Sequence, residues 1–146
     1  MGSRERGHCL LVVSEDDALH RRIEEDLALV PCDVHRRTRE EVSDPAFWRR
    51  QECYPGAVLL DLDEDLDAGV TVLLALKRAR VPSPVIVLTP MFSREFGTKI
   101  VSQGIGYCLS RDFDSHELCE VVASLVWPRQ EKAAARQTPR PRGRTE

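Results

Sequence analysis

Three short runs of apolar residues constrain most strongly how this chain can fold. They are Cys9–Val13, Val58–Leu60 and Val85–Leu88, each bounded by polar or turn residues. Strands that are apolar on both faces are typical of a parallel sheet covered by helices on each side. Two weaker strands are expected around Cys32–Arg36 and Gly106–Ser110. The sequence therefore predicts a parallel sheet of five strands.

Amphipathic helices are predicted between these strands, because apolar residues repeat there at spacings of three and four. The repeats are Leu19, Ile23, Leu27 and Val30; Val70, Leu73, Leu74 and Leu76 to Ala79; and Leu118, Val121, Val122, Leu125 and Val126. A further helix, the fourth along the chain, is expected to begin near Met91, with Phe92, Phe96 and Ile100 on one face.

Local signals mark where helices begin. Ser14 to Asp17 and Asp114 to Glu117 each place an acid three residues after an N-cap residue. Asp44 followed by Pro45 predicts a short second helix that runs through Trp48. Strands and helices then alternate along the chain, and right-handed crossovers place helices on both faces of the sheet. The expected fold class is an open, doubly wound α/β fold.

Charge divides the chain of 146 residues into an acidic body and a basic tail. Residues 128–146 hold six Lys or Arg against two Glu, a net charge of +4, which leaves −7 for residues 1–127. The tail has no large apolar residue, so it is predicted not to fold. We expect an N-terminal arm at 1–7, one domain at 8–127 and this tail. The acidic body makes nucleic acid an unfavourable partner.

Other features exclude several classes of protein. No window holds the roughly 18 apolar residues that cross a bilayer, and no apolar stretch of a secretory signal follows the first charges. Five cysteines without a C-x-x-C pair suit free thiols in a reducing cytoplasm, where we expect the protein. There is no glycine-rich loop for nucleotide phosphates, and the histidines and cysteines lack metal-site spacing.

The residues that follow the strands carry the predicted chemistry, because the carboxyl ends of parallel strands meet at one edge of the sheet. Ser14 to Asp17 follow the first strand, Asp61 the third, Thr89 the fourth and Arg111 the fifth. Crowded carboxylates favour a Mg²⁺ ion, and a hydroxyl with a cation can hold a phosphoryl group. The pattern predicts metal-assisted phosphoryl transfer with Asp61 as the nucleophile.

Each of these residues also has a simpler interpretation when it is taken alone. Ser14, Asp16 and Asp17 are common in the first turn of a helix. Thr89 can be an ordinary loop residue, and Arg111 can be a solvated surface cation. Their coincidence at four strand ends favours a shared site.

From about His8 to Trp127 the sequence resembles a response-regulator receiver domain of two-component signalling. The motifs that carry the resemblance are LLVVSEDDALH, VLLDLDEDLDAG, PVIVLTP and GIGYCLSRDF. Asp61 precedes Gly69 by eight residues, and Thr89 precedes Arg111 by twenty-two, as in that family. The resemblance implies a flavodoxin-like sheet with strand order 2-1-3-4-5.

The resemblance also implies a role for each matching residue. Asp61 is expected to accept a phosphoryl group from a histidine kinase or a phosphotransfer protein. Glu15 is the expected acid of a Mg²⁺ site, which Asp61, the backbone carbonyl of Asp63 and Asp16 would complete. Thr89 and Arg111 are expected to stabilise the phosphorylated form.

Signalling in this family passes through the face formed by the fourth helix, the fifth strand and the fifth helix. The resemblance therefore implies docking of a downstream protein on that face, and a homodimer is one assembly it allows. Met91, Phe92 and Phe96 are the residues we expect on this output face. No catalytic activity beyond the domain's own phosphorylation and dephosphorylation is expected.

The sequence departs from the family pattern at several positions. Ser14 stands where the first acid of a pair is usual, which weakens the expected Mg²⁺ site. Arg111 replaces a lysine, and a planar guanidinium fork does not substitute for a compact ammonium. The other departures are Asp112 and Asp65 in place of prolines, and Cys108 at the switch-aromatic position with Tyr107 shifted by one. A cis peptide bond after Arg111 is consequently not expected.

Three hypotheses about function follow. The first is a single-domain, atypical receiver that is phosphorylated on Asp61 and signals by protein docking. The second is a pseudo-receiver, a protein-interaction module that works without phosphorylation. The third is a haloacid-dehalogenase-like phosphatase, because Asp61, Asp63 and Thr89 resemble its D-x-D and Thr motifs.

Overall fold

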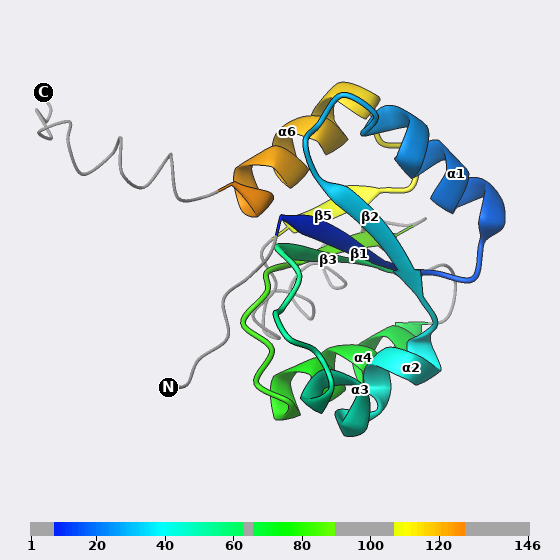
Figure 1. The fold of residues 1–146 in the computed structure, drawn as a ribbon. Helices are drawn as coiled ribbons and strands as arrows, with labels where there is room; N and C mark the ends of the chain where they lie inside the picture. The colour runs from blue at the N-terminus through cyan, green and yellow to red at the C-terminus, as the bar shows by residue number, and fades with distance from the viewer. Residues whose placement is uncertain (1–7, 63–65, 90–106, 128–146) are drawn as a thin grey trace, which may run out of the picture.

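The computed structural model describes residues 8–62, 66–89 and 107–127. Within these ranges the strands form one sheet in the order β2-β1-β3-β4-β5, and all neighbouring strands are parallel (Figure 1). The strands are β1 (Cys9–Val13), β2 (Asp33–Arg37), β3 (Ala57–Asp61), β4 (Val85–Thr89) and β5 (Tyr107–Ser110). The predicted strand order and the doubly wound α/β class are confirmed.

Helices cover both faces of the sheet (Figure 1). Helices α1 (Asp17–Asp26) and α6 (Ser115–Val126) lie on one face, and α2 (Arg39–Ser43), α3 (Pro45–Arg49) and α4 (Leu66–Arg78) lie on the other. The helix expected near Met91, and the N-terminal arm and basic tail, fall outside the described residues. Among the described helices, none has the length and apolarity that a bilayer-spanning segment requires.

Two separate cores explain why the strands are apolar on both faces. Along β1, Leu10 and Val12 pack into the core beneath α1 and α6, whereas Leu11 and Val13 pack into the core above α2 to α4. Side chains of a strand alternate between its two faces, so each face needs its own apolar set. In β3 every residue is buried, which fits its position in the middle of the sheet.

The helix starts agree with the sequence signals except at α1. Asp44 caps α3 as predicted, since its Oδ1 accepts a hydrogen bond from the Ala46 N–H at 2.9 Å. Asp114 begins α6 without a side-chain cap bond. At α1 the N-cap is Asp16, two residues later than the predicted Ser14. Ser14 is drawn away from capping because its hydroxyl bonds to another strand end.

Helix α2 is an element that the sequence analysis missed. Thr38 Oγ1 accepts from the Glu41 N–H at 3.1 Å, and Glu41 Oε1 accepts from the Thr38 N–H at 2.8 Å. This reciprocal capping box was present in the sequence as a Thr followed three residues later by a Glu. Helices of five residues are too short for the periodicity that revealed the longer ones.

The apolar stripe of α4 differs from the predicted one. Val72, Leu73 and Leu76 are buried, whereas Leu74 is 37% exposed and Val70 is half-buried. Leu73 and Leu76 of the predicted stripe are therefore confirmed, whereas Gly69 and Val72 are buried in place of Val70 and Leu74. Leu62, directly after Asp61, packs against Gly69 and is 1% exposed.

Gly69 leaves room for this close approach of Leu62. A Cβ atom built on Gly69 would overlap Leu62 Cδ2 and would lie 3.2 Å from Leu62 Cγ. The spacing of eight residues from Asp61 to Gly69 therefore reflects packing of α4 against the residue that follows the acidic strand end.

We predict that Gly69→Ala destabilises the protein although alanine is the better helix former. Helix propensity favours alanine by about 1 kcal/mol, but overpacking a buried contact costs typically 1–3 kcal/mol. A net loss of about 1 kcal/mol is expected in the free energy of unfolding, measured by urea denaturation. Lys77→Ala, at an exposed position of the same helix, is the control. A more stable Gly69→Ala protein would contradict the tight packing against Leu62.

Candidate functional site

The predicted site residues meet at the carboxyl edge of the sheet. Asp61 ends β3 opposite Leu88 of β4, and Thr89 ends β4 opposite Ser110 of β5. The Arg111 N–H continues this ladder and donates to the Thr89 carbonyl at 3.0 Å. Parallel pairing therefore brings Asp61, Thr89 and Arg111 to one edge, as the sequence predicted.

Asp61 is a buried carboxylate with two identified donors on one oxygen. Its side chain is 3% exposed. Oδ2 accepts a hydrogen bond from the Ser14 hydroxyl at 2.8 Å and another from Arg111 Nη2 at 3.2 Å. A buried carboxylate is tolerated when donors and an opposite charge compensate its lost hydration. Ser14 and Arg111 supply both forms of compensation.

Ser14 links the end of β1 to the end of β3. It is 1% exposed, and while its hydroxyl donates to Asp61 it also accepts from the Asp16 N–H at 3.0 Å. The simpler interpretation of Ser14 as a first-turn helix residue is therefore wrong. A neutral hydroxyl stands directly beside Asp61, where the family resemblance leads one to look for a second carboxylate.

Arg111 bridges two carboxylates. The same Nη2 atom lies 3.2 Å from Asp61 Oδ2 and 2.9 Å from Asp16 Oδ2. The other oxygen of Asp16 caps α1, accepting from the Ala18 and Leu19 N–H groups at 3.0 and 3.2 Å. The Leu19 N–H and the Arg111 guanidinium lower the pKa of the Asp16 carboxyl from its usual value. Arg111 is thus paired with two carboxylates, and its interpretation as a solvated surface cation is wrong.

Glu15 does not join this arrangement. The resemblance implied that it is the metal-binding acid, but its side chain is exposed, and Asp16 is the acid after β1 that approaches Arg111. Asp63, whose carbonyl was expected as a further ligand, lies outside the described residues.

Two further arginines at this edge were not recognised in the sequence. Arg36 Nε donates to the Ser14 carbonyl at 3.0 Å, and Arg36 Nη1 pairs with Asp17 Oδ1 at 2.5 Å. Arg39 Nη2 donates to the Asp61 carbonyl at 3.1 Å. They come from the end of β2 and the start of α2. The rule applied to the other strands, that residues after a strand line the site, would have found Arg39 but not Arg36, which lies within β2.

The described residues at this edge do not present a Mg²⁺ donor set. No group of three His, Cys, Asp or Glu residues that could hold a metal occurs within residues 8–62, 66–89 and 107–127. Mg²⁺ prefers several oxygen ligands in octahedral geometry. Here Asp61 and Asp16 both pair with a guanidinium, and the neighbour of Asp61 is a hydroxyl.

The switch and output residues are only partly described. Tyr107 is 41% exposed at the start of β5, and Cys108 is half-buried against the core above α2 to α4. Met91, Phe92 and Phe96 lie outside the described residues. No cis peptide bond occurs in the described ranges, which agrees with the expectation for the bond after Arg111.

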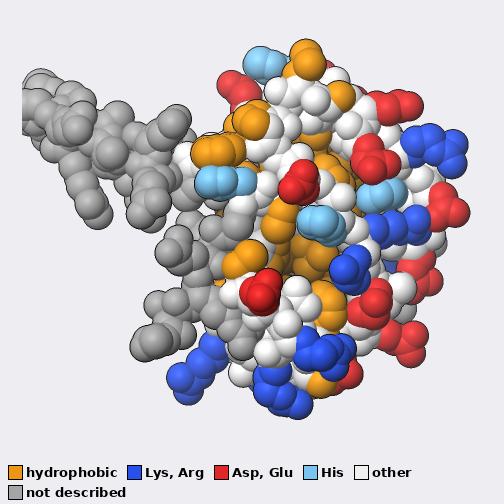
Figure 2. Space-filling view, viewed as in Figure 1, with side chains coloured by type: hydrophobic (Ala, Val, Ile, Leu, Met, Phe, Trp, Pro, Cys, Tyr) orange, Lys and Arg blue, Asp and Glu red, His pale blue; other side chains and the backbone are white. Residues whose placement is uncertain are grey.

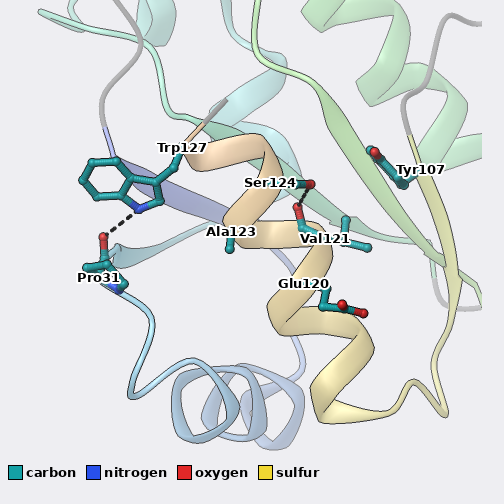
Figure 3. Close-up of a pocket in the computed structure, with 7 residues that line it drawn as sticks. All are labelled: Pro31, Tyr107, Glu120, Val121, Ala123, Ser124 and Trp127. Carbon is teal, nitrogen blue, oxygen red and sulfur yellow. Dashed lines mark hydrogen bonds between the residues drawn. The ribbon is translucent and has the colours of Figure 1, made fainter. Parts of the chain in front are cut away.

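A broad pocket of about 910 Å³ lies away from this site (Figure 3). Its lining residues are Pro31, Tyr107, Glu120, Val121, Ala123, Ser124 and Trp127. Pro31 precedes β2, Tyr107 begins β5 and Trp127 follows α6, so the pocket borders the amino edge of the sheet, opposite Asp61. Trp127 Nε1 donates to the Pro31 carbonyl at 3.2 Å (Figure 3).

The surface seen in Figure 2 mixes charges of both signs. Acidic and basic side chains alternate over the side where α1 and α2 lie, and hydrophobic side chains gather between the two helical layers.

All five cysteines are free thiols, and of these Cys53 is exposed and the others half-buried.

Solved receiver domains share this fold. A signal receiver domain from Vibrio parahaemolyticus aligns over 91% of this chain and 98% of its own, with a TM-score of 0.71 and 19% identity. The receiver domain of the Francisella response regulator 1452 aligns over 80% and 94%, with a TM-score of 0.68 and 19% identity. A CheY-like response regulator from Mesorhizobium loti aligns over 84% and 99%, with a TM-score of 0.63 and 23% identity.

Comparison of sequences alone gives no match, either to a protein-family model or to a curated protein. At the identities of the structural matches, the likeness establishes the fold. The chain has the fold of a response-regulator receiver domain.

We predict that the charge of Asp16 stabilises the protein in a pH-dependent way. Asp16→Asn keeps an N-cap acceptor but removes the carboxylate that faces Arg111. Because the folded-state pKa of Asp16 is lowered, its contribution is present above the unfolded pKa of about 4 and is lost as pH falls through the folded value.

Asp16→Asn should therefore lower the unfolding free energy at pH 6 by up to about 1 kcal/mol, the range of a partly exposed ion pair. The difference from the wild type should shrink at pH 3.5. Urea denaturation at the two pH values measures it, and a deficit of equal size at both would mean that lost packing, and not charge, is responsible.

Proposed function

We propose that this chain is a receiver-type signalling module that acts by docking onto another protein, with Asp61 held by Ser14 and Arg111 rather than phosphorylated. The observation that carries the proposal is the Arg111 bridge, in which one nitrogen contacts both Asp61 and Asp16. This is the second hypothesis of the sequence analysis, the pseudo-receiver.

The bridge supports this proposal through charge. Phosphoryl transfer to a carboxylate needs a cation to offset the charge of donor and acceptor, and a divalent ion supplies it when carboxylates converge. Here Arg111 already pairs with Asp61 and with Asp16, and Ser14 adds no second carboxylate beside Asp61. Both contacts come from one guanidinium nitrogen, which carries two N–H bonds, so Arg111 ties the two carboxylates together.

Docking is the output proposed for such a domain. Tyr107 is a large, partly exposed side chain on edge strand β5, and it borders the pocket that Val121 and Trp127 of the α6 side also line. Aromatic residues are enriched at protein interfaces relative to the rest of a protein surface. We propose β5 and α6 as the described part of the docking face.

The free thiols accord with the cytoplasmic location that we propose.

The second candidate function is phosphorylation of Asp61 by a histidine kinase or a phosphotransfer protein. It is favoured by the convergence of Asp61, Thr89 and Arg111 at one edge, which retains an acceptor, a hydroxyl and a cation. In that case Arg111 would take the role that the family resemblance gives to a lysine.

Intact-protein mass spectrometry separates the two candidates. The full chain is incubated with acetyl phosphate and Mg²⁺, beside Asp61→Asn. We expect no phosphoryl adduct on the wild type. An adduct on the wild type that is absent from Asp61→Asn would overturn the proposal and establish Asp61 as the acceptor.

A paired substitution tests why the site is closed. Ser14→Asp with Arg111→Lys places a second carboxylate beside Asp61 and replaces the fork by a point charge. We expect this double variant to bind Mg²⁺ in a calorimetric titration and to become phosphorylated. Asp61→Asn in the same background should abolish both. A folded double variant that neither binds Mg²⁺ nor gains an adduct would show that Ser14 and Arg111 are not what closes the site.

A further inference from the structure

The loop that carries Arg111 is held by an arginine from the other end of the chain. Arg22 of α1 donates from Nη1 to the Arg111 carbonyl at 3.2 Å and from Nη2 to the Phe113 carbonyl. The two ends of one guanidinium fork thus hold the loop on both sides of Asp112. These contacts join residues 89 and 91 positions apart in sequence.

Packing of Phe113 against Arg22 and into the core also holds this loop. The Arg22 guanidinium carbon lies 3.9 Å from the centroid of the Phe113 ring, and Phe113 is 2% exposed in the core beneath α1 and α6. A guanidinium stacked on an aromatic face gains cation–π attraction. Asp26, one turn further along α1, forms an ion pair with the same guanidinium, with Oδ2 3.7 Å from Arg22 Nε.

Arg111 is the loop residue whose side chain reaches Asp61, whereas Arg22 contacts the backbone carbonyls of the loop. The Arg111 N–H is bound to the Thr89 carbonyl at 3.0 Å, and its carbonyl is bound to Arg22. With the backbone held on both sides, the Arg111 side chain is directed over the edge toward Asp61 and Asp16. Arg22 itself has no identified contact with either acid.

We propose that Arg22 is the positioning residue that holds Arg111 against Asp61. The inference deepens the proposed function and rests on it, since there the Arg111 bridge keeps the site closed. Its geometric basis is the fork, because two carbonyls separated by one residue accept from two nitrogens of one rigid group. Lysine, with a single nitrogen, cannot reproduce that arrangement together with the stacking on Phe113.

The test follows the Arg111 side chain directly by NMR on the full chain, with arginine labelled with ¹⁵N. The Arg111 guanidinium signal is assigned by its disappearance in Arg111→Lys. In Arg22→Ala we expect hydrogen exchange of the Arg111 guanidinium to accelerate roughly 2- to 10-fold, the equilibrium factor typical of one lost hydrogen bond. Arg21→Ala is the matched control, because Arg21 is the neighbouring exposed arginine of α1; its exchange should equal that of the wild type.

Arg22→Lys separates charge from geometry. It keeps the positive charge beside Asp26 but loses the fork, so we expect accelerated exchange as in Arg22→Ala. Backbone amide spectra of β1 and β3 confirm that each variant is folded, and Arg22→Lys alone decides the question if Arg22→Ala unfolds. Unchanged Arg111 exchange in the folded Arg22 variants, or equal acceleration in Arg21→Ala, would overturn the positioning role.

The readout is independent of the proposed function. It needs no phosphodonor or Mg²⁺, so a phosphorylated wild type would overturn the pseudo-receiver function without touching the role of Arg22. Conversely, unchanged exchange of the Arg111 guanidinium in the Arg22 variants would exclude the positioning role of Arg22. The result of the phosphorylation experiment would not be affected.

Discussion

A carboxylate buried at the end of a central strand is the constraint on which the rest of this site depends. Asp61 is 3% exposed on its side chain, and an ionised carboxylate taken out of water costs several kcal/mol unless it is paired and hydrogen-bonded. Ser14 and Arg111 provide those partners directly. Removing the charge of Arg111 would take away a cationic partner of this buried acid and leave the Ser14 hydroxyl bond in place.

Compensation at this edge is organised around arginine. Arg36, Arg39 and Arg111 come from three segments and bind the backbone or carboxylates of the strand ends. A guanidinium presents several donors in one plane, so it can satisfy an acid and a carbonyl that a divalent cation would otherwise organise. In this receiver fold the carboxyl edge of the sheet carries three guanidinium groups and the Ser14 hydroxyl. The pocket at the opposite edge is separate from this chemistry.

Much of the fold was predictable because it follows from local patterns. The runs Cys9–Val13 and Val85–Leu88 became β1 and β4 with the predicted bounds or one residue more. The departures from prediction have local causes: α2 is too short to show periodicity, and in α4 Gly69, which packs against Leu62, is buried in place of Val70. Convergence of Asp61, Thr89 and Arg111 was also predictable, since parallel pairing fixes which strand ends meet.

The sequence by itself determined where the apolar strands lie along the chain, the class of the fold and which residue types stand at the carboxyl edge of the sheet. Only the tertiary structure decided which atoms pair: Ser14 with Asp61 instead of with its helix, Asp16 instead of Glu15 with Arg111, and Arg22 with a loop about ninety residues away. The physical reason is range. Secondary structure follows from neighbours within a few positions, whereas a hydrogen bond forms only within about 3 Å of its partner. That distance is set by how distant elements pack.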